Sequence, residues 1–397
     1  MLNERMYQLG SKRSSIREIF EYAKARAQEI GAENVFDFSI GNPSVPAPDA
    51  VNQTIEKLVK QMPSVALHGY TSAQGDKFVR DTIASNYSKR FNVAISGDDL
   101  YMTCGAAASL TITLNALHEE GDEVIVFAPY FAEYRVFIEG SGAKLVVLPS
   151  DEKTMLPDFT ALEKAINKNT KAVLINSPNN PSGVVYGEET MQTLCKLLKG
   201  KSAQLGKRIF LISDEPYREL IYDKKTVVVS PMRYYEDSIV CYSYSKSLSL
   251  PGERIGYIAV NPCMENAKAV YASVCGAGRS LGFVCAPALF QRVVAECDGM
   301  TADLSIYKRN RDLLYNALTE YGFTCIYPDG AFYLFMKAGE ADAKAFCERA
   351  KKHELLFVAG DDFGYAGWVR IAYCVQTEQI ERALPLFKAL AKEYNLV

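Results

Sequence analysis

The sequence has few of the residues that mark metal-binding and disulfide-bonded proteins. Among its 397 residues are three histidines and one tryptophan, and its ten cysteines are scattered without a Cys-x-x-Cys pair. None of the histidines has the spacing of a metal ligand. We therefore expect neither a zinc site nor a disulfide framework.

Targeting and membrane-spanning patterns are missing as well. The opening residues, MLNERMYQLGSKR, are charged and have no apolar stretch behind them, unlike a signal peptide. No apolar run approaches the roughly 18 residues that a membrane span requires. Together with the unpaired cysteines, this predicts a cytoplasmic protein that contacts no membrane and whose thiols are reduced and mostly buried.

The charge is nearly balanced, with 44 basic and 47 acidic residues and a net charge of −3. Basic runs of the kind found in nucleic-acid-binding proteins are missing, so a nucleic acid partner is not expected. Hydrophobic residues make up 48% of the chain, enough for a sizeable core. The length predicts two or three domains of about 150 residues each.

What the sequence does contain is a series of short apolar runs, each ending in a loop and then a helical stretch. The runs cover residues 100–104, 123–128, 143–148, 171–176, 208–213, 238–243 and 255–260. They predict an α/β fold whose large domain holds a mostly parallel seven-stranded sheet flanked by helices. Ligands of such sheets gather at the carboxyl ends of the strands.

The two ends of the chain follow a different pattern. Near the N-terminus, residues 14–31 predict an amphipathic helix, with a capping box of Ser15 and Glu18 and a single apolar stripe. The stripe consists of Ile16, Ile19, Phe20, Ala23, Ala27 and Ile30.

Near the C-terminus, a long helix is predicted across 302–322, with short strands at 332–337 and 368–373. We therefore expect residues 289–397 to form a smaller α+β domain, completed by the N-terminal segment 1–50. The large domain then spans residues 51–288.

Residues that can bind a ligand or take part in a reaction follow several of the predicted strands. Small residues, Gly105-Ala106-Ala107, open a helix where a phosphate can approach free N–H groups. Either Tyr130 or Phe131 offers a ring that can stack on a flat cofactor. Alone, the small residues are equally compatible with tight packing, and an aromatic residue at a strand end is more often part of the core.

Three further strand ends carry polar groups. Asn180-Pro181 resembles a fixed turn with a cis peptide, Asp214 ends an apolar run, and Lys246 follows the next run. Singly, these could be an ordinary turn, a helix cap and a surface lysine. Asp214 and Lys246, however, lie 32 residues apart on successive strand–helix units, a combination that points to a shared site.

The combination matches the needs of pyridoxal phosphate. The aldehyde of this cofactor bonds a lysine amine, and its ring nitrogen needs a carboxylate to stay protonated as an electron sink. Its phosphate needs an arginine, hydroxyls and helix N–H groups, which Arg254, Ser243 and the small-residue turn at 105–107 can supply.

Seven stretches, in order along nearly the whole chain, resemble the class I/II aminotransferases of pyridoxal phosphate fold type I, the aspartate aminotransferase superfamily. They are DFSIGNPS (37–44), GYTSAQG (69–75), NSPNNPSG (176–183), ISDEPYREL (212–220), SYSKSLSLPGERIG (243–256), PDGAFYLF (328–335) and WVRIAY (368–373). The resemblance implies a ping-pong transfer of an amino group from an L-amino acid to a 2-oxo acid.

The resemblance also implies a role for individual residues. Lys246 bonds the cofactor and shuttles the substrate proton, Asp214 pairs with the ring nitrogen, and Tyr217 and Asn180 bond the phenolic oxygen. Phe131 stacks on the ring. Arg370 grips the substrate carboxylate, with Gly41 and Asn180 beside it. The phosphate is held by Gly105, Ala106, Ala107, Ser243, Ser245 and Arg254, and by Tyr70 of the other subunit, which implies a homodimer with shared sites.

The substrate is less clearly indicated. Ala106 and Ala107 stand where some relatives carry a larger polar residue or a lysine that reads an acidic side chain. Arg279 and Arg17 are then the candidate readers of an acidic side chain in an enzyme of the aspartate or glutamate type. Both arginines are also compatible with a purely structural or surface role.

Parts of the sequence bear on three other functions. The string SYSK matches the S-x-x-K motif of penicillin-binding serine hydrolases, but their Ser-Asp-Asn and Lys-Thr-Gly partners are missing, and their motif opens a helix where ours is expected to end a strand. A ligand-sensing regulator would need a DNA-binding module before residue 30, where there is room for only a short helix. A pyridoxal-dependent C–S or β-lyase stays open as the alternative, because the cofactor motifs do not fix the reaction.

Overall fold

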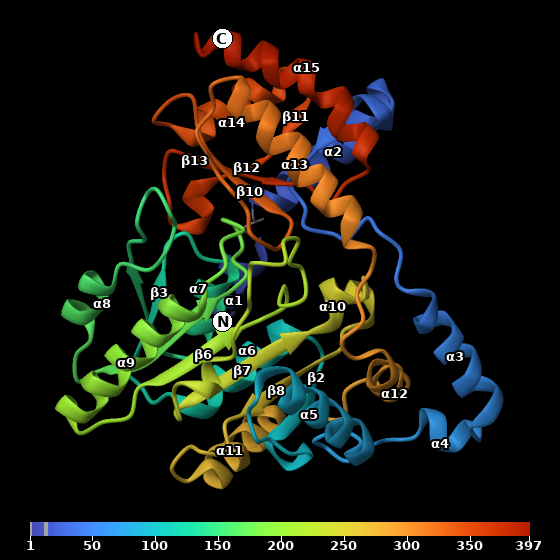
Figure 1. The fold of residues 1–397 in the computed structure, drawn as a ribbon, viewed down its shortest axis with the longest axis vertical. Coiled ribbons are helices and arrows are strands. Elements are labelled where there is room, and N and C mark those ends of the chain that lie inside the picture. Colours follow the sequence, from blue (N-terminus) through green and yellow to red (C-terminus); the bar gives the residue numbers. More distant parts are fainter. Residues whose placement is uncertain (1, 12–14) are drawn as a thin grey trace.

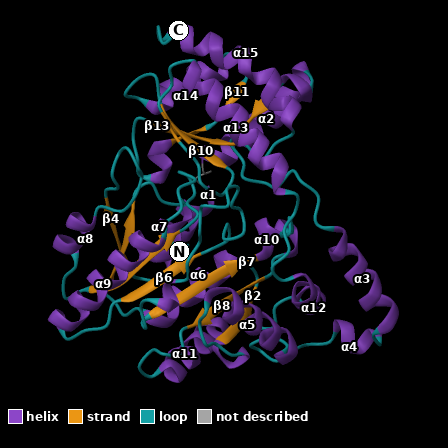
Figure 2. Cartoon of the chain, in the orientation of Figure 1, coloured by secondary structure: helices purple, strands orange, loops and turns teal. Residues whose placement is uncertain are grey.

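A seven-stranded sheet forms the centre of the larger part of the molecule (Figures 1 and 2). The computed structural model describes residues 2–11 and 15–397. In sheet order the strands are β2 (Leu100–Thr103), β8 (Gly256–Val260), β7 (Ser238–Ser243), β6 (Phe210–Asp214), β5 (Thr170–Asn176), β3 (Glu123–Phe127) and β4 (Lys144–Leu148). All neighbours pair in parallel except β8, which is antiparallel to β2 and β7. The predicted mostly parallel sheet is confirmed.

The central strands are continuous apolar runs because both faces of the sheet are covered. Along β3, Val124 and Val126 pack on one side while Ile125 and Phe127 pack on the other. The first face is covered by α6 (Ala106–Leu117), α7 (Glu133–Gly140) and α11 (Ala267–Ser280). The second is covered by α3 (Asp49–Gln61), α5 (Lys77–Phe91) and α12 (Ala288–Cys297) at one end, and by α8 (Phe159–Ala165) and α9 (Glu188–Leu205) at the other. The short α4 (Ser64–His68) follows α3.

The smaller part of the molecule lies above this sheet in Figure 1 and combines both ends of the chain. Its antiparallel sheet has the order β12 (Val358–Ala359), β13 (Trp368–Ala372), β10 (Tyr333–Lys337) and β9 (Cys325–Ile326). A separate parallel pair joins β1 (Phe36–Asp37) to β11 (Leu355–Leu356). The surrounding helices are α2 (Ser15–Ile30), α13 (Leu304–Glu320), α14 (Ala343–Lys351) and α15 (Thr377–Glu393).

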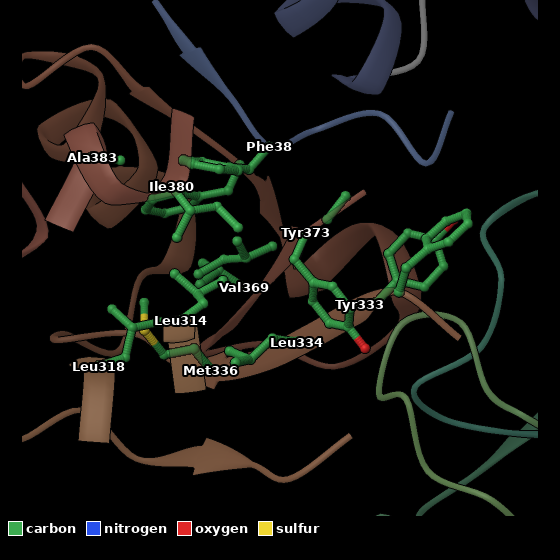
Figure 3. Close-up of a cluster of buried hydrophobic side chains, with 14 of the residues drawn as sticks. Phe38, Leu314, Leu318, Tyr333, Leu334, Met336, Val369, Tyr373, Ile380 and Ala383 are labelled. Carbon is green, nitrogen blue, oxygen red and sulfur yellow. The ribbon is translucent and has the colours of Figure 1, made fainter. Parts of the chain in front are cut away.

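Side chains from these elements form one apolar core, shown in Figure 3. Phe38, from the N-terminal segment, packs against Phe387 of α15 with ring centroids 5.9 Å apart. Leu314 and Leu318 of α13 and Val369 of β13 are completely buried in the same cluster. The N-terminal segment is thus an integral part of the C-terminal core.

The helices and strands predicted at the two ends of the chain are confirmed, with two corrections in α2. Phe20 does not belong to the buried stripe of α2, since 45% of it is exposed. Ser15 is the first residue of α2 and donates its hydroxyl hydrogen to the carboxylate of Asp362.

The prediction of mostly buried thiols is wrong: all ten cysteines are free, but only Cys195, Cys241, Cys297 and Cys374 are buried. No helix within residues 2–11 and 15–397 has both the length and the apolarity to cross a membrane.

Candidate active site

A cavity of about 350 Å³ lies at the carboxyl ends of the central strands, where the small sheet faces the large one. This volume lies within the range of small-molecule sites. Most of the residues predicted from the sequence line it: Gly41, Ala106, Ala107, Phe131, Asn180, Asp214, Tyr217, Ser243, Ser245, Lys246, Arg254 and Arg370. The chain therefore brings together side chains that are more than 300 positions apart.

Lys246 reaches the cavity from a short helix, α10 (Tyr244–Ser247). Strand β7 ends at Ser243, whose hydroxyl accepts the N–H of Ser245 and so caps this helix. The expectation that the SYSK string ends a strand is thus wrong for three of its four residues: Ser243 ends β7, and Tyr244, Ser245 and Lys246 belong to α10. The helical turn forms because the serine hydroxyl satisfies a free N–H at its start.

The Lys246 amine donates a hydrogen bond to the carbonyl oxygen of Gly41 at 2.6 Å. Burial, with a smaller contribution from the positive charges of Arg370 and Arg254, lowers the pKa of Lys246 from 10.5 to about 8. A lowered pKa increases the share of neutral amine at physiological pH. Lys246 can therefore act as a nucleophile and as a base, roles that a solvated lysine performs poorly.

Asp214 is the last residue of β6 and is buried at the bottom of the cavity wall. One carboxylate oxygen, Oδ2, accepts a hydrogen bond from the Tyr134 hydroxyl at 2.6 Å. The other, Oδ1, is buried and has no hydrogen-bond partner among the described residues. Burial raises the pKa of Asp214 to about 7, although the Tyr134 hydrogen bond acts in the opposite direction. A buried, half-satisfied carboxylate is costly unless a cationic or donor group meets it.

An anion-binding corner forms where α6 begins. Gly105 precedes the helix with a φ of 86°, a conformation that favours glycine, and an added Cβ would lie 2.6 Å from the Arg254 guanidinium. Arg254 donates to the carbonyl oxygens of Cys104 and Pro251. The hydroxyls of Ser243 and Ser245 are 2.7 Å apart in the same corner. A guanidinium, two hydroxyls and a helix N-terminus together suit a phosphate.

Arg370 enters from β13 on the opposite side of the cavity. It donates to Asn180 Oδ1 at 3.0 Å and to the carbonyl oxygen of Ser39. Its guanidinium packs over the rings of Tyr333 and Phe363, with its central carbon 4.6 and 4.8 Å from their centroids. The buried Nε has no partner among the described residues. The group is thus held rigidly, with a donor left over for a ligand.

Tyr217 and Tyr333 form a pair in the wall between Asp214 and Arg370. Their hydroxyl oxygens are 3.0 Å apart and both side chains are buried. Gly41 has no room for a side chain, because a Cβ would overlap the Tyr333 hydroxyl. The peptide bond between Asn180 and Pro181 is cis, as predicted.

Four of the predicted site residues do not line the cavity of this chain. Tyr70 is 98% exposed, Arg279 lies on the exposed surface of α11, and Arg17 lies on the exposed surface of α2. Gly105 likewise is not part of the lining but fixes the turn beside it.

Several residues of the site were not predicted. Tyr134 and Tyr333 make the polar contacts described above, and Asn176 donates to the backbone carbonyl of Asp214 at 2.9 Å. Apolar lining comes from Ile16 of α2, Ile40, Leu110 and Phe137. The available signal for Asn176 and Tyr333 was their position inside the stretches NSPNNPSG and PDGAFYLF, and Tyr134 lies three residues after Phe131.

Comparison with known proteins agrees with this geometry. The family model described as "Aminotransferase class I and II" matches residues 33–386. A probable aspartate aminotransferase of Methanocaldococcus jannaschii is 30% identical, over 96% of this chain and 97% of its own length. The aspartate aminotransferase of Thermotoga maritima is 31% identical, over 91% of this chain and 93% of its own.

Solved structures give the same result. The crystal structure of an amino transferase from Eubacterium rectale superposes with a TM-score of 0.97 and 56% identity, covering 100% of this chain and 99% of that one. The aspartate aminotransferase of Thermus thermophilus with maleate gives a TM-score of 0.86 at 25% identity, covering 98% and 99%. The chain is therefore a transaminase and belongs to the class I and II aminotransferases, with the fold type I architecture.

Proposed function

We propose that the chain binds pyridoxal phosphate in the cavity around Lys246 and moves an amino group from an L-amino acid to a 2-oxo acid in two half-reactions. The observation that carries the proposal is the buried Oδ1 of Asp214, which has no hydrogen-bond partner among the described residues. It lies in the wall of the cavity that also holds the amine of Lys246, whose pKa is lowered. The carboxylate oxygen is complementary to a cationic ring nitrogen, and the amine is complementary to an aldehyde.

The residues present fit this cofactor. Lys246 would hold it through its amine, Asp214 would face its ring nitrogen, and Phe131 would lie against its ring. Tyr217 and Asn180 would bond its phenolic oxygen. The corner formed by Gly105, Ala106, Ala107, Ser243, Ser245 and Arg254 would hold its phosphate. When bound, the group supplies an electron sink for bond cleavage at the substrate Cα.

The chain's own residues then bind the substrate and move its proton. Arg370 presents fixed donors to the α-carboxylate, because Asn180, Ser39 and two aromatic rings already set its orientation. The neutral amine of Lys246 takes the proton from the substrate Cα and later returns it. Ile16 of α2 and Ile40 contribute apolar surface to the cavity and help to exclude water.

We propose that the amino donor is of the aspartate or glutamate type. The relatives named above include enzymes named for aspartate. A further relative, from Thermus thermophilus, is 28% identical and is named aspartate/prephenate aminotransferase. Within the described part of the chain, the cations that line the cavity are Lys246, Arg254 and Arg370, each with a role already assigned. An acidic side chain would then be read by Arg279 of a second subunit or by Arg17.

A homodimer with shared sites is part of the same proposal. Tyr70 is almost fully exposed, as expected for a residue that completes a site on another subunit. Residues 51–288 would form the cofactor domain, and the segments 1–50 and 289–397 would close over the substrate. We further propose a cytoplasmic location, which the ten free cysteines support.

The test is to add single amino acids to the protein in its pyridoxal form and follow the cofactor absorbance, released 2-oxo acid and ammonia. Bleaching with one 2-oxo acid per site and no ammonia is the expected result, and the fastest donor should be acidic. Continuous ammonia release without an acceptor would instead indicate a lyase, which the family and the names of its relatives do not favour.

A further inference from the structure

We propose that Tyr134 is a positioning residue for Asp214: its hydroxyl binds one carboxylate oxygen and so leaves the other for the ring nitrogen of the cofactor. The proposal rests on the proposed pyridoxal phosphate function. It gives a buried tyrosine, which sequence alone does not distinguish from a core residue, a role in orienting the carboxylate that would face the ring nitrogen.

The contact is short and completely buried. The Tyr134 hydroxyl lies 2.6 Å from Asp214 Oδ2, and both side chains are buried, with 1% of Tyr134 and 4% of Asp214 exposed. Asp214 Oδ1 has no partner among the described residues. A carboxylate with one oxygen anchored and one free has a single productive orientation, which is the property that a ring-nitrogen partner requires.

Tyr134 is itself held in place by the turn that precedes it. Its backbone N–H donates to the carbonyl of Phe131 at 2.9 Å, and the two rings meet edge to face with centroids 5.6 Å apart. Phe131 lines the cavity. One turn of chain at the start of α7 therefore provides both the stacking ring and the anchor of the carboxylate.

The backbone of Asp214 is fixed independently, because Asn176 donates to its carbonyl oxygen. Tyr134 is thus left to orient the side chain. The adjacent carboxylate of Glu215 bonds Ser213 and Arg218 instead.

The ionisable groups around Asp214 do not replace this hydrogen bond. Besides Tyr134, they are Glu215 on the same strand end, Tyr217 three residues on, and the Cys241 thiol of β7. Burial raises the pKa of Asp214 and the Glu215 carboxylate adds a smaller rise, whereas the Tyr134 hydrogen bond lowers it. Loss of the hydroxyl therefore favours the protonated, neutral carboxyl, which is the wrong partner for a cationic nitrogen.

Tyr134→Phe removes the hydroxyl and keeps the ring. We expect pyridoxal phosphate, measured by equilibrium dialysis against the cofactor-free protein, to bind about 10- to 100-fold more weakly, the range of one charge-assisted hydrogen bond. The pH below which affinity falls should rise by about one unit. Tyr186→Phe is the matched control, since Tyr186 is buried and lines the same small void as Tyr134.

Two further measurements guard against a simple loss of structure. In an Asp214→Asn background, Tyr134→Phe should change affinity less than about threefold, since the charged acceptor is gone. Placing 3-fluorotyrosine at position 134 makes the hydroxyl a stronger hydrogen-bond donor. It should lower the pH below which cofactor affinity falls, here called the pH limit. Wild-type affinity and pH limit in Tyr134→Phe, or full additivity with Asp214→Asn, would overturn the proposal. Failure of the wild-type protein to take up pyridoxal phosphate would instead refute the proposed function.

Discussion

The role of Arg370 gives the most direct quantitative prediction. Arg370→Lys keeps the positive charge but replaces a planar fork with a single point charge. The guanidinium in this structure is held between two rings and donates to Asn180 and Ser39, so its remaining donor geometry is fixed before the substrate arrives. The lysine variant should therefore lose at least one charge-assisted hydrogen bond to the substrate carboxylate.

The loss of one such bond corresponds to about 1.5–3 kcal/mol, or roughly a 10- to 150-fold decrease in kcat/KM for the amino acid donor. The decrease should lie mainly in KM if the carboxylate is gripped equally in the ground and transition states. The assay is steady-state transamination at saturating 2-oxo acid, run well below the unfolding temperature, because the buried Ser39 carbonyl also loses a donor.

Two controls isolate the carboxylate. A primary amine without a carboxyl group should react equally poorly with the wild type and with Arg370→Lys. Arg382→Lys changes an exposed arginine that bonds Asn34 and should leave the kinetics unchanged. A change in kcat/KM below about twofold for the amino acid, or an equal loss for the amine, would refute the assignment of Arg370.

Three further predictions concern specificity, packing and protonation. Arg279→Ala should lower kcat/KM for aspartate and glutamate far more than for alanine; equal losses would remove Arg279 as the reader of an acidic side chain. Gly256→Ala should cost about 1–3 kcal/mol in thermal unfolding and weaken cofactor retention, because the new methyl overlaps the Tyr242 carbonyl and crowds Gly105; an unchanged melting temperature would contradict this packing. The pKa of Lys246 is about 8 in the folded protein and 10.5 ordinarily. Between these pH values the unfolded chain binds more protons than the folded protein, so the free energy of unfolding rises as pH rises through them. Without cofactor, Lys246→Met should thus be more stable than the wild type at neutral pH. The difference between their free energies of unfolding, measured by chemical denaturation, should narrow between pH 8 and 10.5. A difference that stays constant with pH would contradict the lowered pKa of Lys246.

The sequence was a good guide where local pattern decides structure. The strands that end at Asp214 and Ser243 are buried on both faces, so their uninterrupted apolar runs were recognisable. The antiparallel direction of β8 was not predictable, because an apolar run looks the same in either direction. Its partners β2 and β7 are far from one another in sequence, and only tertiary packing selects the direction.

The residues of the active site likewise include some that could be predicted from the sequence and some that could not. Asp214 and Lys246 were found because ionisable groups beside apolar runs are unusual, and Arg370 was found because it lies in WVRIAY, one of the stretches that resemble the family. Tyr134 and Tyr333 were not found, because a tyrosine near a strand is ordinarily a core residue, and its hydroxyl partner lies elsewhere in the chain: the two partners are 80 and 116 positions away. Hydrogen bonds of this kind depend on the assembled fold and leave no local sequence signal.

The most direct test of the account is to locate the covalent attachment of the cofactor. The protein in its pyridoxal form is reduced with borohydride, digested, and mapped by mass spectrometry. The account predicts one cofactor per chain, attached to Lys246, and no attachment in Lys246→Met. Attachment to any other lysine, or no attachment in a protein that still transfers amino groups, would contradict it.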